Sequence, residues 1–359
     1  MMDIGIPKER RPFEFRVGLS PAGVEMLCQN GHTIFVEHEA GSGAGFADKE
    51  YEDAGARTVY SSEEVFGRAE LVLKVSRPTE EEMAFLQPGA AVAGLLHLAS
   101  TRQSRIETLL KNKISAIAYE QIREPDGSLP VLRPFSQIGG AMAAEVAARL
   151  LRSDQGGRGV LLGGIPGVPP AEVVILGAGT AGTHAARAFN GLGAHVTVLD
   201  KDVNALQRIS ECGVNLVTML STQRNIERVC EFADVLVGAV LVPGSRAPVL
   251  VTRELVKKMK PRSVIVDISI DEGGCVETSH PTTHDHPTFI EENVVHYCVP
   301  NMPGVVARTA THGFVNAAIA YILDIANLGV GGAMAKNSAI ELAVNTHQGE
   351  IRHLSRLIK

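Results

Sequence analysis

Short apolar runs alternate with segments of helical spacing along most of the chain. In the first third, the apolar runs predict strands at residues 3–6, 32–37, 71–75, 91–96 and 114–119. Between them, the spacing of apolar residues predicts helices at residues 21–30, 61–68, 78–85 and 101–111. Ser20 ahead of Pro21, and either Ser61 or Ser62, are the expected helix caps. Apolar strands that alternate with helices are typical of a parallel sheet covered on both faces.

The same alternation resumes in the second half and predicts a second doubly wound α/β domain. Its strands are expected around Val173, Val196, Leu216, Val235, Val264 and Val295. An Ala-rich helix at 137–151 should bridge the two domains, and the Gly- and Pro-rich stretch 156–170 should form a hairpin-like entry to the second one. Two more helices are predicted at 309–328 and 339–357. The chain can return through them to the first domain, and a small substrate would lie in the cleft between the domains.

Composition narrows the class of protein. The chain has 359 residues, 45% hydrophobic and 21% charged residues and a net charge of −6 without a basic stripe, which argues against nucleic acid or an anionic membrane as a partner. The N-terminus lacks the apolar core of a signal peptide, and no apolar run approaches the roughly 20 residues that cross a bilayer. Five cysteines without a CxxC pair favour a reducing, cytoplasmic location, and no metal site is expected.

The most informative stretch is 171–200, which reads as strand, Gly-rich turn, helix, strand and acid. In GAGTAG, Gly177 permits a tight turn, Gly179 lets the backbone approach a pyrophosphate, and Gly182 lets the helix pack closely on the strand. Asp200 ends the second strand, where it would accept hydrogen bonds from both ribose hydroxyls and repel a 2′-phosphate. The pattern predicts a dinucleotide site that prefers NAD to NADP, against the alternative of a Gly-rich turn in an ordinary α/β domain.

Two polar residues interrupt or end apolar strands. Lys74 lies inside LVLKV, where it must be paired or functional; it is either an anion ligand at the strand's carboxyl end or an edge-strand lysine that reaches solvent. His97 ends AVAGLLH, where ligands of open α/β sheets bind. It suits proton transfer, and the alternative is a histidine that merely satisfies a junction between strand and loop.

Three more polar residues are candidates for a site. Asp267 and Asp271 lie in VIVDISIDEGG, where strand alternation would put both on one face and Asp271 at the strand end, facing the nicotinamide or capping the next turn. Arg16, in EFRVGLSP, is an anion ligand or a solvated charge. Asn301, in VPNMPG, is a rigidly held site residue or a turn residue. Two cations, an imidazole, a carboxylate and an amide suit a small substrate that carries its own carboxylate.

Long stretches outside the Gly-rich turn are also distinctive. They are GIPKE, FRVGLSPAGV, LVLKV, LLHLAS, AIAYE, GGRGVLLGGIPGV, GAGTAG, GAVLVPGSRAP, VDISIDEGGCVET and HYCVPNMPG. Together they make the chain resemble the alanine dehydrogenase family over nearly its whole length. The resemblance implies NAD-dependent, reversible oxidative deamination of L-alanine to pyruvate and ammonium by a homo-hexamer. It also implies a substrate domain made from both chain ends, 1–130 with 309–359, around a central NAD domain at 131–308.

The resemblance also implies a role for each matching residue. Arg16 and Lys74 would hold the substrate carboxylate, and His97 and Asp271 would be the acid/base pair. Asn301 would line the site of substrate and nicotinamide. The residues that would contact NAD are Ser136, Gly177, Gly179, Thr180, Ala181, Gly182, Asp200, Leu241, Ile268, Asp271 and Asn301.

The chain departs from the family's usual residues at several positions. Leu95 replaces tyrosine, Phe135 replaces methionine and Glu272 replaces glutamine, all near the expected site. His280 stands where arginine is common, and Ala205 lies where a basic residue is common. A dehydrogenase of another small L-amino acid is therefore an alternative function. A second alternative is an NAD(H)-binding subunit of a transhydrogenase, which resembles this fold and turns over no small substrate.

Overall fold

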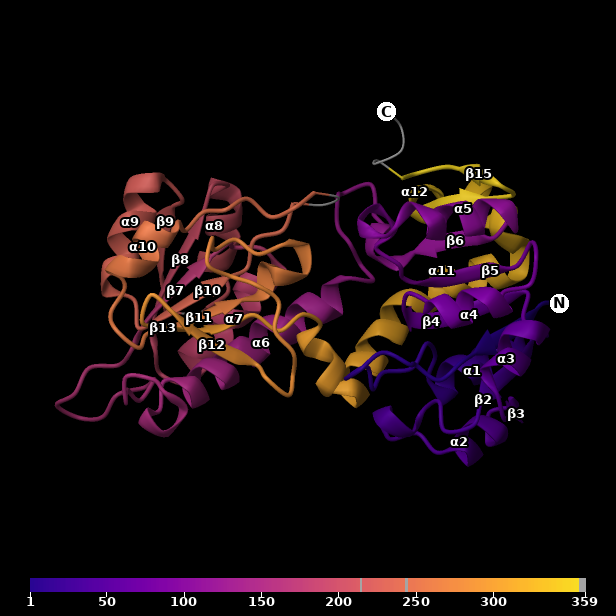
Figure 1. Cartoon of the computed structure of the whole chain (residues 1–359), viewed down its shortest axis with the longest axis horizontal. Helices are drawn as coiled ribbons and strands as arrows, with labels where there is room; N and C mark the ends of the chain where they lie inside the picture. The colour runs from indigo at the N-terminus through magenta and orange to yellow at the C-terminus, as the bar shows by residue number, and fades with distance from the viewer. Residues whose placement is uncertain (214, 243–244, 355–359) are drawn as a thin grey trace. The chain divides into compact units, whose positions relative to one another are not determined.

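The computed structural model describes residues 1–213, 215–242 and 245–354. The chain forms two compact units: residues 1–135 with the chain from 303 onward, and residues 136–302. Each unit contains its own largely parallel sheet with helices packed against it (Figure 1). The predicted α/β class with two doubly wound sheets is confirmed. The boundary between the units falls inside helix α6 (Arg133–Leu150).

The first unit is built on an eight-stranded sheet in the order β15-β14-β6-β5-β4-β1-β2-β3. Its strands are β1 (Asp3–Ile6), β2 (Thr33–Glu37), β3 (Arg57–Val59), β4 (Leu71–Ser76), β5 (Ala91–Leu95), β6 (Ser115–Ala118), β14 (Val344–His347) and β15 (Glu350–Ile351). β1 to β6 run parallel, whereas β14 and β15 are antiparallel to their neighbours. The chain moves from β1 to β2 on one side and returns to β4 on the other. The carboxyl ends of β1 and β4 therefore form a topological switch point.

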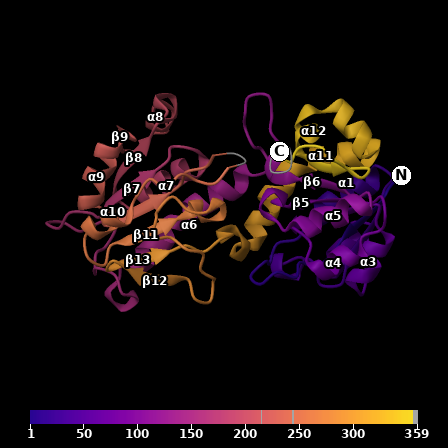
Figure 2. The same ribbon diagram turned by 45° about the horizontal axis from the view of Figure 1, so that its top comes forward.

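Helices cover both faces of this sheet. They are α1 (Pro21–Gln29), α2 (Asp48–Asp53), α3 (Ser62–Arg68), α4 (Glu80–Phe85), α5 (Gln103–Lys111), α11 (Ala307–Lys336) and α12 (Ser338–Ala343). α3, α4 and α5 share one hydrophobic core with the sheet, and α11 and α12 lie on the other side (Figure 2). Ser61 is the cap of α3, because its hydroxyl accepts the Glu64 N–H at 3.1 Å. α4 starts two residues later than predicted because Thr79 and Glu82 form a capping box.

The predicted helix at 339–357 is wrong over most of its length. α12 ends at Ala343, and the chain turns into β14, which pairs with the open edge of β6. Thr346 is buried there and its hydroxyl donates to the Ile114 carbonyl at 2.9 Å. Pairing with a strand far away in sequence outweighs the local helical pattern because it satisfies an otherwise exposed sheet edge. The last part of the prediction, residues 355–357, lies outside the described residues.

Helix α11 begins two residues before the helix predicted at 309–328. Its backbone leaves helical geometry at Gly329 (φ 70°, ψ 167°), directly after the predicted end, and a second helical segment follows to Lys336. By length and composition alone α11 could cross a bilayer. Its apolar side, including Phe314, Ala318 and Ile322, is buried within the first unit.

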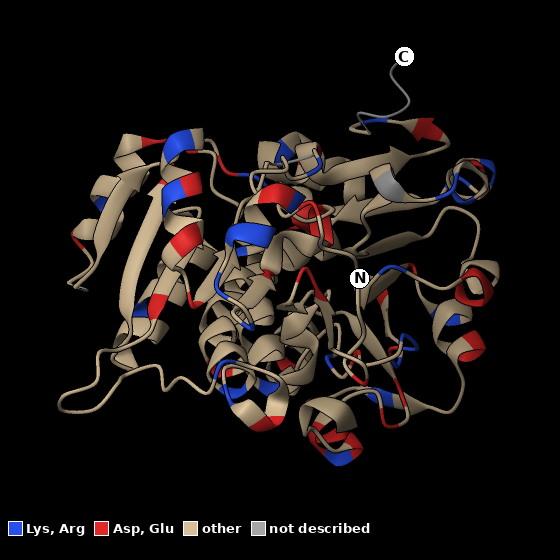
Figure 3. Cartoon of the chain, turned by 60° about the vertical axis from the view of Figure 1, so that its left-hand side comes forward, with Lys and Arg blue, Asp and Glu red and all other residues tan. Residues whose placement is uncertain are grey.

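Acidic and basic residues are interspersed over the elements of the chain (Figure 3).

The second unit has a seven-stranded sheet in the order β12-β13-β11-β10-β7-β8-β9. Its strands are β7 (Glu172–Leu176), β8 (His195–Asp200), β9 (Val217–Leu220), β10 (Val235–Gly238), β11 (Val264–Asp267), β12 (Thr288–Glu291) and β13 (Val294–Tyr297), and β12 alone among them is antiparallel. Its helices are α7 (Thr180–Gly191), α8 (Val203–Ser210), α9 (Gln223–Phe232) and α10 (Arg253–Lys258). The switch point lies between β7 and β10.

Strand β7 shows why its sequence is apolar throughout. Val173 and Ile175 pack in one core with Phe189 of α7, whereas Val174 and Leu176 pack in another with residues of α9 and α10. A strand with helices on both faces has no polar side, so its residues do not alternate between apolar and polar.

The packing of α6 on α7 depends on one glycine. A Cβ atom on Gly140 would lie 2.2 Å from the Ala181 carbonyl oxygen and 2.9 Å from the Ala185 nitrogen. The preceding Gly139 has more room, since its Cβ would meet only the Ile268 side chain, at 3.5 Å. Gly140 therefore sets the distance between the two helices, and Gly139 does not.

We predict opposite effects of alanine at these two glycines. Gly140→Ala should lower the free energy of unfolding by at least about 1–3 kcal/mol, because the backbone of α7 must move. Gly139→Ala is the matched control and should be neutral or stabilising by up to about 1 kcal/mol, because alanine favours a helix. Denaturant unfolding measures both. Equal losses in the two variants would contradict close packing at Gly140 alone.

Candidate active site

The loop after β1 crosses β4 at the switch point of the first unit. A Cβ atom on Gly18 would lie 2.2 Å from the Leu73 carbonyl oxygen, so this loop packs directly on the β4 backbone. Glu9 reaches β4 from the same loop: its Oε1 accepts the N–H groups of Val75 at 2.7 Å and Ser76 at 3.3 Å. The loop therefore brings its charged residues to the carboxyl end of β4.

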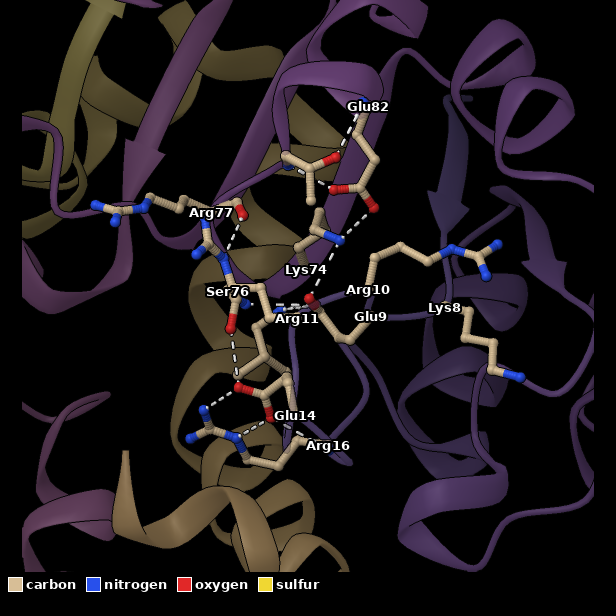
Figure 4. A network of polar contacts seen from close by, with 12 residues as sticks. Lys8, Glu9, Arg10, Arg11, Glu14, Arg16, Lys74, Ser76, Arg77 and Glu82 are labelled. Atoms are coloured by element: carbon tan, nitrogen blue, oxygen red, sulfur yellow. Dashed lines mark hydrogen bonds and ion pairs between the residues drawn. The ribbon is translucent and has the colours of Figure 1, made fainter. Parts of the chain in front are cut away.

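Lys74 is fully buried in β4 and neutralised by two glutamates. Its Nζ lies 2.9 Å from Glu82 Oε1 and 3.2 Å from Glu9 Oε2, and its side chain is 1% exposed. Figure 4 shows both acids pointing at the lysine. The edge-strand alternative is wrong, because β4 lies between β1 and β5. Burial opposes the charge on Lys74, but Glu9 and Glu82 outweigh it and raise the pKa of the lysine.

Arg16 is buried as well, so it is not a solvated charge. Its Nε and Nη2 donate to Glu14 Oε1 and Oε2 at 2.6 and 2.5 Å, and the Ser76 hydroxyl donates to the same carboxylate at 2.8 Å. The guanidinium stands 4.7 Å from the centre of the Phe135 ring. Burial would raise the pKa of Glu14, but Arg16 outweighs it and keeps this pKa low. Phe135, one of the departures from the family pattern, thus contacts a candidate substrate ligand.

These contacts bring Arg16 and Lys74 into one network with three acids that the sequence analysis did not single out (Figure 4). The missed residues are Glu9, Glu14 and Glu82. One signal was available: two cations expected in apolar surroundings require counter-charges, and glutamates flank both positions in the sequence. The spacing of residues in the sequence could not show which glutamates neutralise Lys74, because Glu82 reaches it from a different element, α4.

His97 follows β5 in a left-handed backbone conformation, with φ 44° and ψ 44°. Two acceptor bonds hold this turn: Glu120 accepts the N–H of Leu96 at 3.1 Å and that of His97 at 2.6 Å. The imidazole Nδ1 is 4.0 Å from Glu120 Oε1, and the side chain is 37% exposed. His97 is therefore accessible and lies beside the Glu120 carboxylate.

The Gly-rich turn of the second unit has the geometry expected for a phosphate cradle. Gly177 has φ 109°, and a Cβ on Gly182 would lie 1.8 Å from the Gly177 carbonyl oxygen, so both need to be glycine. A Cβ on Gly179 would meet nothing within 4 Å, which leaves room above the turn. Thr180 and Ala181 begin α7, whose N-terminal N–H groups and dipole favour an anion. A pyrophosphate fits this turn.

Asp200 connects the end of β8 to the turn. Its Oδ2 accepts the Ala178 N–H at 2.7 Å and its Oδ1 accepts the Asp202 N–H at 2.9 Å. Leu241 follows β10 and Ile268 follows β11, at the same carboxyl edge of the sheet as the turn, and Ser136 is half-buried in α6.

The expectation that a strand carries Asp267 and Asp271 on one face is wrong. β11 ends at Asp267, and residues 268–272 form a 3-10 helix. Asp267 is buried and its Oδ2 accepts the N–H groups of Cys275 and Val276 at 3.0 and 3.3 Å, which folds the chain back. Asp271 is exposed beyond the strand, and its Oδ1 accepts the Asn301 N–H at 3.1 Å. The structure thus brings Asp271 and Asn301 together.

The candidate residues form two groups, one in each unit. Arg16, Lys74 and His97 belong to the first, and the Gly-rich turn, Asp200, Asp271 and Asn301 to the second. Over the described residues, no group of three or more His, Cys, Asp or Glu side chains could hold a metal ion. The chemistry available is carboxylate binding and proton transfer in one unit and dinucleotide binding in the other.

Both halves of the chain match one protein family. Residues 5–139 match the alanine dehydrogenase/PNT N-terminal domain, and residues 143–354 match the corresponding C-terminal domain. An alanine dehydrogenase of Mycolicibacterium smegmatis is 44% identical over 98% of this chain and 94% of its own length. One from Staphylococcus haemolyticus is 46% identical over the same shares.

Solved structures give the same result. An L-alanine dehydrogenase superposes with a TM-score of 0.94 at 46% identity, covering 99% of this chain and 98% of the other. A transhydrogenase from Sinorhizobium meliloti superposes with a TM-score of 0.84 at 24% identity, over 97% and 99% of the two chains. The second match shows a shared fold only.

We predict that Lys74 is needed for the stability of the first unit. Lys74→Met should cost about 3–5 kcal/mol at neutral pH, because it leaves two buried carboxylates without their cation. Their pKa values rise in the variant, so the loss should shrink as the pH falls and protons neutralise Glu9 and Glu82. Denaturant unfolding at a series of pH values measures this.

The exposed Lys49, paired with Asp53 at 3.2 Å, provides the control. Lys49→Met should leave the free energy of unfolding nearly unchanged. A Lys74→Met loss that is the same at every pH would contradict the charge argument.

Proposed function

The chain belongs to the alanine dehydrogenase/PNT family, and on that premise we propose that it catalyses the reversible, NAD-dependent oxidative deamination of L-alanine to pyruvate and ammonium. The observation that carries the proposal is the pair of buried cations, Arg16 and Lys74, at the carboxyl edge of the sheet in the first unit. A buried guanidinium and a buried ammonium suit the carboxylate that alanine and pyruvate have in common.

The cofactor is proposed to be NAD. Bound NAD would accept the hydride from the substrate Cα, and NADH would return it in the reverse reaction. Its pyrophosphate would lie over Gly179 at the start of α7, and its ribose hydroxyls would donate to Asp200, whose charge opposes the 2′-phosphate of NADP. The remaining contacts are proposed for Ser136, Thr180, Ala181, Leu241 and Ile268.

Proton transfer is proposed for His97 and Asp271. Deamination requires a base for the substrate ammonium group and groups that exchange protons with the water that replaces the nitrogen. His97 is accessible and lies beside Glu120, whose carboxylate holds the turn that presents it. Asp271 is held by the Asn301 N–H, so that Asn301 both orients Asp271 and lines the site.

The choice of amino acid would depend on residues near the carboxylate site, among them Leu95 and Phe135. Phe135 lies under the Arg16 guanidinium and stacks on Phe314 with ring centroids 5.8 Å apart, so it helps shape the place where the substrate carboxylate would bind. A bulky wall next to the carboxylate ligand favours a small side chain such as a methyl group. Another small L-amino acid remains the alternative substrate. A transhydrogenase-like subunit, which turns over no amino acid, would have no use for this carboxylate site.

Self-association into a homo-hexamer is part of the proposal, as is a cytoplasmic location, which suits the five free cysteines of the described chain. The hairpin-like stretch 156–170 supports assembly. Its bridge joins Ile165 and Val168, and it exposes Leu161, Ile165 and Val168 to 66, 60 and 55%. Three exposed apolar side chains on one projecting segment are typical of a surface that a second copy covers.

A panel of L-amino acids and 2-oxo acids, assayed by NADH absorbance, tests the function. L-Alanine with NAD should give the highest kcat/KM, and pyruvate should require ammonium for NADH oxidation. NADP should be much poorer, and Asp200→Ala should reduce the difference between the cofactors because the opposing charge is gone. If the enzyme turns over none of the amino acids, the proposed function is wrong. If it uses NAD and NADP equally well, Asp200 does not determine the choice of cofactor.

The mass in solution tests the assembly. The wild-type chain should run as a hexamer by light scattering. Ile165→Asp should yield smaller species, because it places a charge in an apolar interface, while the free energy of unfolding of the separated chain should not fall. Val203, at the start of α8, offers a control position, since it is 65% exposed and lies outside the hairpin. Smaller species from Val203→Asp alone would place the interface elsewhere.

A further inference from the structure

Among the buried charged side chains around Lys74, carboxylates outnumber cations. Glu9 and Glu82 contact Lys74 at 3.2 and 2.9 Å, and Glu14 forms a two-pronged pair with Arg16. All five side chains are buried. With every group ionised, these five charges sum to minus one. A substrate carboxylate bound to the same two cations would bring the sum to minus two among buried side chains, which is strongly unfavourable.

Of the three acids, Glu14 and Glu82 each use both carboxylate oxygens in hydrogen bonds. Glu14 receives two bonds from Arg16 and one from Ser76. Glu82 uses one oxygen for Lys74 and the other to accept the Thr79 N–H of the α4 capping box at 2.7 Å. Neither carboxylate has an oxygen left over for a proton without loss of a charge-assisted bond.

Glu9 differs from both. Its Oε1 accepts two backbone N–H groups, whereas its buried Oε2 accepts none and is held, among the described residues, by the ion pair with Lys74. The groups that face it are Lys74, Glu14, Glu82 and the Val75 N–H. Burial raises the pKa of Glu9, Lys74 and the Val75 N–H oppose the rise, and Glu14 and Glu82 add to it. A proton on Oε2 therefore breaks no hydrogen bond to the backbone and weakens only the ion pair with Lys74.

We propose that Glu9 takes up a proton from solvent when the substrate carboxylate binds to Lys74 and Arg16, so that the buried network keeps its charge. The inference rests on the proposed function and adds a positioning residue that acts through Lys74. An ammonium group has three donors, and two of them on Lys74 point to Glu82 and Glu9. The third is left for the substrate, and a neutral Glu9 lets Lys74 shift its attraction to the incoming anion.

The affinity for the substrate carboxylate should depend on pH. An added anion disfavours ionisation of Glu9, so the pKa of Glu9 is higher in the substrate complex than in the free site. Between those two pKa values, binding takes up a proton, and affinity for the 2-oxo acid falls as the pH rises, by at most about tenfold per pH unit for one proton. Glutamine at position 9 is neutral at every pH and should remove this dependence from KM while kcat keeps its own pH profile.

The test uses the full-length enzyme loaded with NADH in ammonium-free buffer, where pyruvate can bind but no reductive amination can occur. Calorimetric titration with pyruvate in buffers of different ionisation enthalpy counts the protons taken up. We expect net uptake by the wild type and by His97→Gln, and its loss in Glu9→Gln. Uptake that persists in Glu9→Gln, or that vanishes in His97→Gln alone, would overturn the inference.

A second measurement needs no variant at Glu9 and so holds even if Glu9→Gln does not fold. The infrared difference spectrum of the wild type with and without carboxyl-labelled pyruvate should gain the band of a protonated protein carboxyl group. Pyruvate binding and alanine turnover without that band would overturn the role of Glu9 and leave the proposed function standing. Absence of both binding and turnover would instead overturn the proposed function, and this inference with it.

Discussion

The first unit is organised around a lysine that cannot reach water. Lys74 lies in a central strand, so its charge must be balanced by side chains that come from elsewhere in the unit. Glu9 arrives on the loop after β1 and Glu82 on the first turn of α4. Two further features keep these glutamates beside the lysine. Gly18 lets the loop pack closely on β4, and the capping box of α4 fixes where that helix begins. Because the network is costly unless complete, it favours a single arrangement of these elements.

The second unit depends instead on close contacts between main-chain segments. Gly177, Gly182 and Gly140 are positions where a single Cβ atom would collide with a neighbouring main chain. Their effect is to set α7 directly behind the turn, with its N-terminus free of a side-chain cap. An anion can therefore be bound by backbone N–H groups alone, which leaves the surrounding side chains to determine which nucleotide fits.

Under the proposed function, the two units divide the work of a dehydrogenase between them. The resemblance of the sequence to the family implies that the dinucleotide turn and the buried cations are the family's usual residues, whereas Leu95, Phe135 and Glu272 are not. Phe135 contacts the Arg16 guanidinium, so a change of residue there alters the shape of the carboxylate site without changing its charge. Substitution around a preserved set of charges is a route by which one scaffold changes its preferred substrate.

The sequence by itself determined the parallel strands, the Gly-rich turn, the place of Lys74 inside one strand and that of His97 just after another, because apolar periodicity and glycine requirements act over a few residues. Tertiary structure alone decided which glutamates neutralise Lys74, where β11 stops before Asp271, and that the C-terminal segment pairs with β6 rather than remaining helical. These outcomes depend on groups that are far apart in sequence and meet only after folding. A buried charge or an open sheet edge must be satisfied, but the local sequence does not name the partner that satisfies it.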